Sequence, residues 1–228
     1  MTKGFALLLS VFLGGISFSQ TVTIGTQVWM NKNLDVSSFR NGDPIPEAKT
    51  DEEWVRAGRE SRPAWCYYNN VPANGDKYGK IYNWYAVSDP RGLAPKGYHI
   101  PSDVEWTVLT DYLGGTELAG KKIKSVNGWS NNGNGNDSSG FSAIPAGSRW
   151  AMGPFPSTMG CNAAWWTCSE TALTDEQPIG IKPYGAWSRA LLCGDVQLYV
   201  SSECAHADNV FRETCFKEVG LGVRCIRD

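Results

Sequence analysis

Ten tryptophans and 25 glycines in a chain of 228 residues constrain the fold more than any other feature of this sequence. Large flat rings fill a core with few residues, and glycine permits the positive φ angles that tight turns require. Lys and Arg number 21 against 23 Asp and Glu, with neither a basic run nor an acidic tail. The composition predicts many tight turns around an aromatic core, and no surface that attracts nucleic acid or anionic lipid.

The first 19 residues have the pattern of a secretory signal peptide. Lys3 precedes an apolar run at residues 5–16, and a small-x-small pattern then predicts cleavage before Gln20. The run is too short to cross a bilayer of about 30 Å, and no later segment reaches that length. We therefore expect an exported protein in the periplasm, at the cell surface or in the medium, with residues 20–228 forming a single domain.

The first half of the chain carries the helix signals. Thr50 with Glu53, and Ser102 with Glu105, have the spacing of capping boxes, in which each side chain bonds the other residue's backbone amide. The first box predicts a helix of about two turns, and the second predicts a helix that ends at a Gly-Gly pair. Residues 116–125 predict a third short helix.

The pattern of the second half of the chain predicts strands joined by long loops. Residues 127–140 (NGWSNNGNGNDSSG) predict a loop, because Asn, Gly and Ser bond locally or accept positive φ. Alternation at residues 22–30 also predicts one N-terminal strand. Segregated helices and strands favour an α+β fold with small antiparallel sheets. The later strands are expected at residues 141–144, 163–168, 186–193, 196–200, 210–216 and 221–226.

All seven cysteines follow the predicted signal peptide, so an oxidising compartment would let disulfides persist. Cys168 with Cys193 would bridge neighbouring strands, and Cys204 with Cys215 would close the intervening loop. Spacing alone does not fix the connectivity, and one thiol must stay free or pair elsewhere.

Five segments resemble, in order and spacing, the Fibrobacter succinogenes major paralogous domain, which is abundant in exported and surface proteins of Bacteroidetes-type bacteria. The resemblance implies a variant of the C-type lectin-like fold, distantly similar to the formylglycine-generating enzymes, and no assigned activity. The family often carries a Cys that pairs with the terminal Cys, but Ala94 stands there, so Cys225 pairs with a late cysteine or is the odd thiol. The segments are GTQVWMNKNL (25–34), YGKIYNWYAV (78–87), PKGYHIPSDVEWTVL (95–109), SSGFSAIPAG (138–147) and GLGVRCIRD (220–228).

The long loop and the aromatics near it are the candidate ligand contacts, because recognition usually falls on loops carried by a rigid scaffold. Trp129 and Trp150 are expected to be exposed, whereas Trp165, Trp166 and Trp187 are expected to pack in the core. The polar candidates in the loop are Asn131, Asn132, Asn134, Asn136 and Asp137.

The loop also has part of a calcium-binding pattern. Asn132, Asn134 and Asn136 have the 1-3-5 spacing, but Asp137 stands where an EF-hand needs Gly and Ala143 where it needs Glu, which excludes that motif. A lectin-like fold can still bind Ca²⁺ through Asn, Asp and carbonyl oxygens. Ca²⁺ therefore stays an alternative to a plain turn-rich loop without a cofactor.

Three functions fit these observations. The first is a non-enzymatic lectin-like binding or adhesion module for a glycan or a surface protein. The second is a structural subunit of an outer-membrane or extracellular assembly, with the odd thiol paired to a partner. The third is an enzyme related to the formylglycine-generating group, which needs a reactive pair such as Cys161 and Cys168, although neither falls on that enzyme's motif. His99 is expected to make a structural hydrogen bond rather than act in catalysis.

Overall fold

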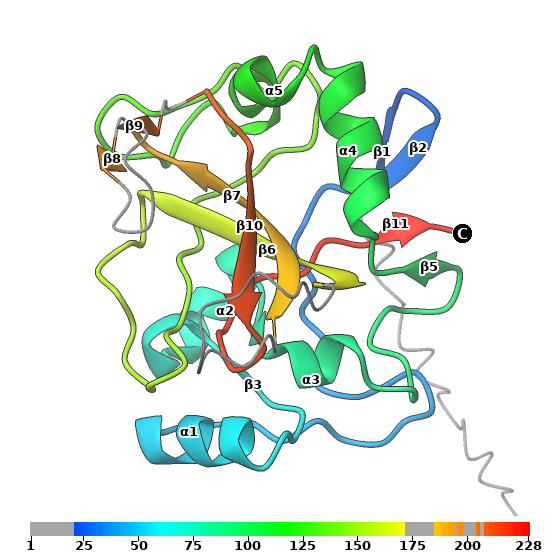
Figure 1. Ribbon diagram of the computed structural model, residues 1–228, viewed down its shortest axis with the longest axis vertical. Coiled ribbons are helices and arrows are strands. Elements are labelled where there is room, and N and C mark those ends of the chain that lie inside the picture. Colours follow the sequence, from blue (N-terminus) through cyan, green and yellow to red (C-terminus); the bar gives the residue numbers. More distant parts are fainter. Residues whose placement is uncertain (1–20, 172–184, 195, 198–203, 206–207) are drawn as a thin grey trace, which may run out of the picture.

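The described part of the chain folds into an α+β domain in which short helices surround four small antiparallel sheets (Figure 1). The computed structural model describes residues 21–171, 185–194, 196–197, 204–205 and 208–228. None of the helices in these residues is long and apolar enough to cross a membrane.

The described part contains five α-helices, two of them only four residues long, and two 3-10 turns. The helical elements are α1 (Asp51–Arg59), η1 (Tyr68–Asn70), η2 (Pro72–Asn74), α2 (Gly75–Tyr78), α3 (Trp84–Val87), α4 (Asp103–Tyr112) and α5 (Thr116–Ile123). The strands are β1 (Thr21–Ile24), β2 (Gln27–Met30), β3 (Trp65–Cys66), β4 (Ile81–Tyr82), β5 (Tyr98–His99), β6 (Asn162–Glu170), β7 (Gly185–Leu192), β8 (Val196–Gln197), β9 (Cys204–Ala205), β10 (Phe211–Phe216) and β11 (Ile226–Arg227).

The sheets join segments that are far apart in the sequence. One sheet has the order β1-β2-β11-β5, so the C-terminal strand lies between the N-terminal hairpin and β5. The second has the order β10-β7-β6, with both pairs antiparallel. The pairs β3-β4 and β8-β9 form the remaining ladders.

Both predicted capping boxes are confirmed. Thr50 and Glu53 exchange side-chain bonds with each other's backbone amides at the start of α1, and Ser102 with Glu105 does the same at the start of α4. The third helix, α5, begins at the expected residue and ends two residues before the expected Ser125. Local capping chemistry thus fixes the starts of α1 and α4, as the sequence suggested, whereas α5 begins after Gly115 without a side-chain cap.

The strand predictions were less accurate. Residues 22–30 form a hairpin rather than one strand, because Gly25 adopts φ +61° and turns the chain back after Ile24. The expected strands at 141–144 and 221–226 reduce to isolated bridges, such as Ala143 with Lys124 and Leu221 with Tyr82, followed by the two-residue β11. Residues 198–200 of another expected strand lie outside the described residues.

One part of the core is built on aromatic rings that pack at tilted or edge-to-face angles. Trp29, Trp106, Phe141 and Trp165 pack with ring centroids 4.9–5.8 Å apart. The neighbouring Trp166 points to the opposite face of β6 and enters a second apolar cluster. Strand alternation is therefore kept, but both faces of β6 are covered and both rings of the pair are buried.

A buried arginine ties the two ends of the domain together. The Arg224 guanidinium donates to the carbonyls of Phe141 (2.5 Å) and Met30 (3.3 Å) and to Asn33 Oδ1 (3.0 Å). The same Asn33 oxygen accepts from Trp165 Nε1 at 2.8 Å. Burial lowers the pKa of Arg224 to about 9, and the charge persists because these oxygens solvate it.

We predict that Arg224→Met destabilises the domain by about 2–4 kcal/mol, because it leaves several buried acceptors without a donor. Urea unfolding followed by tryptophan fluorescence measures the change. The matched control is Arg227→Met, which alters an exposed arginine three residues away and should change stability by no more than about 0.5 kcal/mol. Equal stabilities for the two variants would contradict the role given to Arg224.

Candidate functional site

The predicted loop at residues 127–140 contains no helix or strand, as expected, but it packs against the protein rather than standing free. The backbone amides of Asn136, Asp137 and Ser139 donate to carbonyls at the C-terminal end of α5, at 2.9–3.1 Å. A Cβ on Gly133 would lie 2.0 Å from the Cys193 carbonyl, so that glycine allows close backbone contact. The loop therefore satisfies the carbonyls that a helix end leaves unpaired.

Most of the loop's candidate polar side chains bond within the protein. Asn134 Oδ1 accepts from the Trp129 amide at 2.9 Å, and Asn136 Oδ1 accepts from the Ser138 amide at 3.1 Å. The Asp137 carboxylate accepts from the amide and hydroxyl of Ser142. Asn131 donates to Cys193 Sγ at 3.3 Å, and Asn132 is exposed. Among the described residues no group of three His, Cys, Asp or Glu side chains is placed to hold a metal ion.

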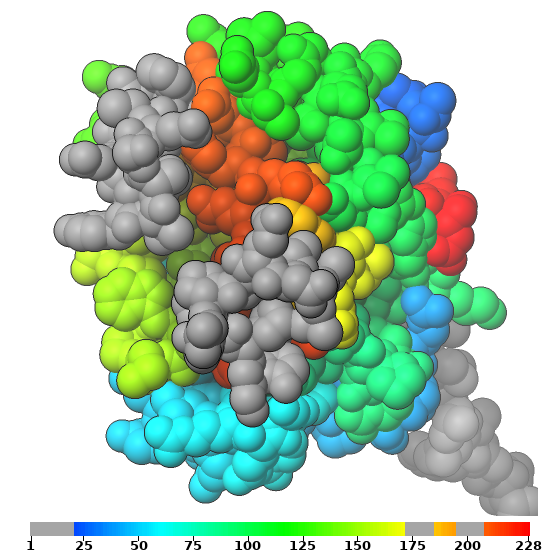
Figure 2. Space-filling model, in the orientation of Figure 1, coloured from blue at the N-terminus to red at the C-terminus, as the bar shows by residue number. Residues whose placement is uncertain are grey.

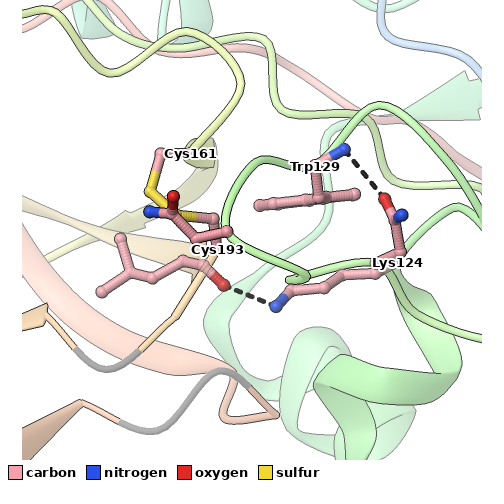
Figure 3. Close-up of a disulfide and its surroundings, with 7 residues drawn as sticks. Lys124, Trp129, Cys161 and Cys193 are labelled. Atoms are coloured by element: carbon pink, nitrogen blue, oxygen red, sulfur yellow. Dashed lines mark hydrogen bonds between the residues drawn. A yellow bond between two sulfur atoms is a disulfide. The ribbon is translucent and has the colours of Figure 1, made fainter.

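Trp129 is not exposed, so that expectation is wrong. Its ring is 5% accessible and joins the core, and its Nε1 donates to the Ala143 carbonyl at 3.0 Å. Figure 3 shows the ring beside the side chain of Lys124, whose Nζ lies 4.7 Å from the ring centroid and donates to the Leu192 carbonyl. The loop thus inserts Trp129 into the protein as an anchor.

Cys193 forms a disulfide, as expected, but its partner is Cys161 and not Cys168 (Figure 3). The register of β6 with β7 explains the difference. Asn162 pairs with Leu192, which brings the preceding and following cysteines opposite each other. Cys168 lies seven residues further along the chain from Cys161, next to the irregular end of the ladder, and is a free, exposed thiol.

The pairing proposed for Cys215 is also wrong, because Cys215 is a free thiol; the side chain of Cys204 lies outside the described residues. Burial raises the pKa of Cys215 to about 11 and that of Cys225 to about 12. Cys225 is free and buried in the same apolar cluster as Ala94, the position where the family often has its partner. Neither thiol is poised to react at neutral pH.

The cysteine pair that an enzyme of the formylglycine-generating kind would need is not formed here. Cys161 is bonded to Cys193. Partial burial, with a smaller contribution from the nearby Glu105 carboxylate, raises the pKa of Cys168. A raised pKa lowers the fraction of thiolate, which is the nucleophile.

His99 lies between two carboxylates, and its role fits the expected structural hydrogen bond. Its Nε2 is 2.8 Å from Glu105 Oε1 and its Nδ1 is 2.9 Å from Asp228 Oδ1. Partial burial opposes the charged form, but the two carboxylates prevail and raise the pKa of His99. The His99 ring thus links the end of β11 to the start of α4.

Trp150 is the tryptophan that the fold leaves on the surface. Eight of the ten tryptophans are buried, Trp187 is half-buried beneath the Arg212 guanidinium, and Trp150 is 56% exposed. It opens a tight turn in which its amide donates to the Pro154 carbonyl and the Gly153 amide donates to the Trp150 carbonyl, both at 3.0 Å. Met152, in the same turn, is 77% exposed. The expected exposure of Trp150 is therefore confirmed.

A fully buried arginine holds this turn against α1. Arg149 donates from Nε to the Gly153 carbonyl (2.7 Å) and from Nη2 to the Thr50 carbonyl and Asp51 Oδ1 (both 2.9 Å). Gly153 packs so closely that a Cβ there would lie 2.7 Å from Cβ of Asp51. The apolar side chains of the turn are thus displayed by a rigid support.

The turn and α1 together border a concavity of about 550 Å³, which we call the α1 pocket. In Figure 2 the yellow-green atoms of the segment around residue 150 adjoin the cyan atoms of α1. This volume falls in the range of small-molecule sites. The lining residues are Asp51, Glu52, Val55, Arg56, Arg59, Glu60 and Met152.

Sequence reasoning found Trp150 but missed its surroundings. The lining of the pocket comes from α1 and from a turn roughly a hundred residues later. No local sequence pattern connects two segments that are so far apart. A signal was nevertheless present, since the helix predicted after Thr50 carries charged residues on nearly every exposed position. The sequence did not indicate that Arg149 is buried, because a lone arginine beside a tryptophan is more often a solvated surface residue.

We predict that peptide mapping of the oxidised protein yields a linked pair containing Cys161 and Cys193. Replacing both with Ser should lower the free energy of unfolding by roughly 3.5 kcal/mol, from the entropy of closing a loop with a sequence separation of 32. Cys168→Ser is the control and should leave stability unchanged. A linked pair that contains Cys168 instead would contradict the strand register described above.

The comparisons with known proteins agree with the motifs. The model of the Fibrobacter succinogenes major domain matches residues 22–227, which is nearly all of the described fold. No curated protein and no solved structure matches the chain. The chain therefore belongs to the Fibrobacter succinogenes major domain family.

Proposed function

We propose that this chain is an exported binding module that holds a glycan, or the glycan-bearing surface of a protein, at the Trp150 turn and the α1 pocket. The observation that carries the proposal is the exposure of Trp150 and Met152 on a turn fixed by a buried arginine. A core of eight buried tryptophans supplies the rigid scaffold, and the exposed one supplies a flat apolar face.

The physical argument concerns conformational entropy. A ligand that binds a mobile loop must order the loop's backbone, which costs conformational entropy. The backbone of the Trp150 turn is already held by two turn hydrogen bonds and by Arg149, so this cost is smaller here. Aromatic residues presented in this way are a common source of binding energy at recognition surfaces.

The lectin-like character and the location outside the cytoplasm belong to this proposal, and they rest on the signal-like N-terminus, the disulfide and the α+β scaffold with long loops.

We predict that a glycan array probed with oxidised residues 20–228 gives specific binding that Trp150→Ala weakens at least about 30-fold, the loss typical of a central aromatic contact. Phe216→Ala, at another exposed aromatic outside the turn and α1, is the matched control and should bind as the wild type does. Adding EDTA should change little, because the oxygens of Asn134, Asn136 and Asp137 already accept hydrogen bonds within the protein. Binding that survives Trp150→Ala would sink the proposed site.

A second candidate function is a structural subunit of an outer-membrane or extracellular assembly. It is favoured by an apolar stripe on α4, where Val104, Val108 and Tyr112 lie one turn apart on the same face and are all exposed. The free, exposed Cys168 lies near the start of this helix, since its amide donates to the Pro101 carbonyl. A partner that covers the stripe would also reach the thiol.

The two candidates are separable by one comparison. A blank glycan array, together with a disulfide-linked partner recovered from the native source under non-reducing conditions, would favour the assembly subunit. Cys168→Ser should then abolish the covalent link, and Val108→Asp should abolish the association itself.

A further inference from the structure

The charged groups of the α1 pocket are not equivalent. Two of its three carboxylates already have a cationic partner: Asp51 is bonded to the buried Arg149, and Glu60 is paired with Arg62. These ion pairs offset negative charge that would otherwise draw cations into the pocket.

The two guanidiniums of the pocket have no such partners. Arg56 and Arg59 are both exposed, and within the described residues neither side chain forms an ion pair or a hydrogen bond with the protein. They stand three positions apart on α1, which places them on one face of the helix. Arg56 also lines a second concavity of about 200 Å³ on the other flank of the helix. Among the described residues, the N–H donors of these two guanidiniums therefore have no protein acceptor and can bind a ligand.

The remaining surface of the pocket is apolar. Val55 is half-buried on α1, and Met152 is 77% exposed across from it. Trp150 belongs to the same turn as Met152. A ligand that fills the site must therefore combine an apolar face with groups that satisfy guanidinium donors.

We infer that the α1 pocket selects anionic sugars, carboxylated or sulfated, over neutral ones; this rests on the proposed function and specifies its ligand. A guanidinium binds a carboxylate or sulfate through two parallel hydrogen bonds, with a preference that a neutral hydroxyl does not match. The sugar's C–H face packs on the apolar side chains of the turn. Its hydroxyls donate to the free lone pairs of Glu52 and Glu60, which would repel a simple inorganic anion.

The test is isothermal titration at low salt with tetragalacturonate, its methyl ester, a chondroitin sulfate tetrasaccharide and cellotetraose. The methyl ester keeps the frame and hydroxyls of the acid and removes only its charge. The free acid, the sulfated sugar, or both should bind about tenfold more tightly than the two neutral sugars. That advantage should shrink as salt screens the exposed charges.

Arg56→Gln and Arg59→Gln should each remove most of the advantage, because they weaken binding of the charged sugars far more than binding of the neutral ones. Gln keeps helix propensity, so circular dichroism should confirm an unchanged fold. Arg227→Gln, at an exposed arginine on β11, is the control and should leave all affinities as they are.

Equal binding of charged and neutral sugars, lost in Trp150→Ala but not in the arginine variants, would overturn the inference and leave the binding function standing. An advantage for the acid that persists in both arginine variants would also overturn it. Absence of binding to all four sugars would overturn this inference together with the glycan-binding function itself.

Discussion

Buried cations that donate to backbone carbonyls are the interaction on which this fold depends. Small sheets and long loops leave many carbonyls inside the protein without a strand partner, and a buried carbonyl without a donor is costly. Arg149 serves Ala48, Thr50 and Gly153, and Arg224 serves Met30 and Phe141. Taking a guanidinium out of water is itself unfavourable, as the lowered pKa of Arg224 reflects, so the arrangement persists because every nitrogen of the two guanidiniums donates at least one hydrogen bond.

The tryptophans perform a similar task, which explains why the chain carries so many. Five buried indoles donate their N–H to backbone carbonyls, so each ring fills the core and satisfies one acceptor. Phenylalanine could fill the same space but has no donor. The high tryptophan content is therefore explained by the fold. A domain with little β-sheet needs large side chains that also carry a hydrogen-bond donor. Arg149 connects the Trp150 turn, the proposed binding surface, to this network.

Features that depend on interactions between residues close in the sequence could be predicted, and features that depend on tertiary contacts could not. Capping boxes act over three residues, so the starts of α1 and α4 were predictable. The α+β class and the domain family followed from segregated patterns and ordered motifs. The partner of Cys193 was not predictable, because it depends on the register of β6 with β7, which tertiary packing sets. Trp129 and Trp150 both lie in irregular segments outside helices and strands, and only tertiary packing makes the first a buried anchor and leaves the second exposed.

The central claim is that a buried guanidinium holds the Trp150 turn rigid, and hydrogen exchange at that turn in Arg149→Lys tests it most directly. Lysine keeps the charge but cannot reach the Gly153 carbonyl and the start of α1 together, since it lacks the planar fork. The account predicts slow exchange of the Trp150 and Gly153 amides in the wild type and at least about tenfold faster exchange in the variant, with the β6-β7 ladder unchanged. Equally slow exchange in both proteins, or fast exchange of these amides in the wild type, would contradict it.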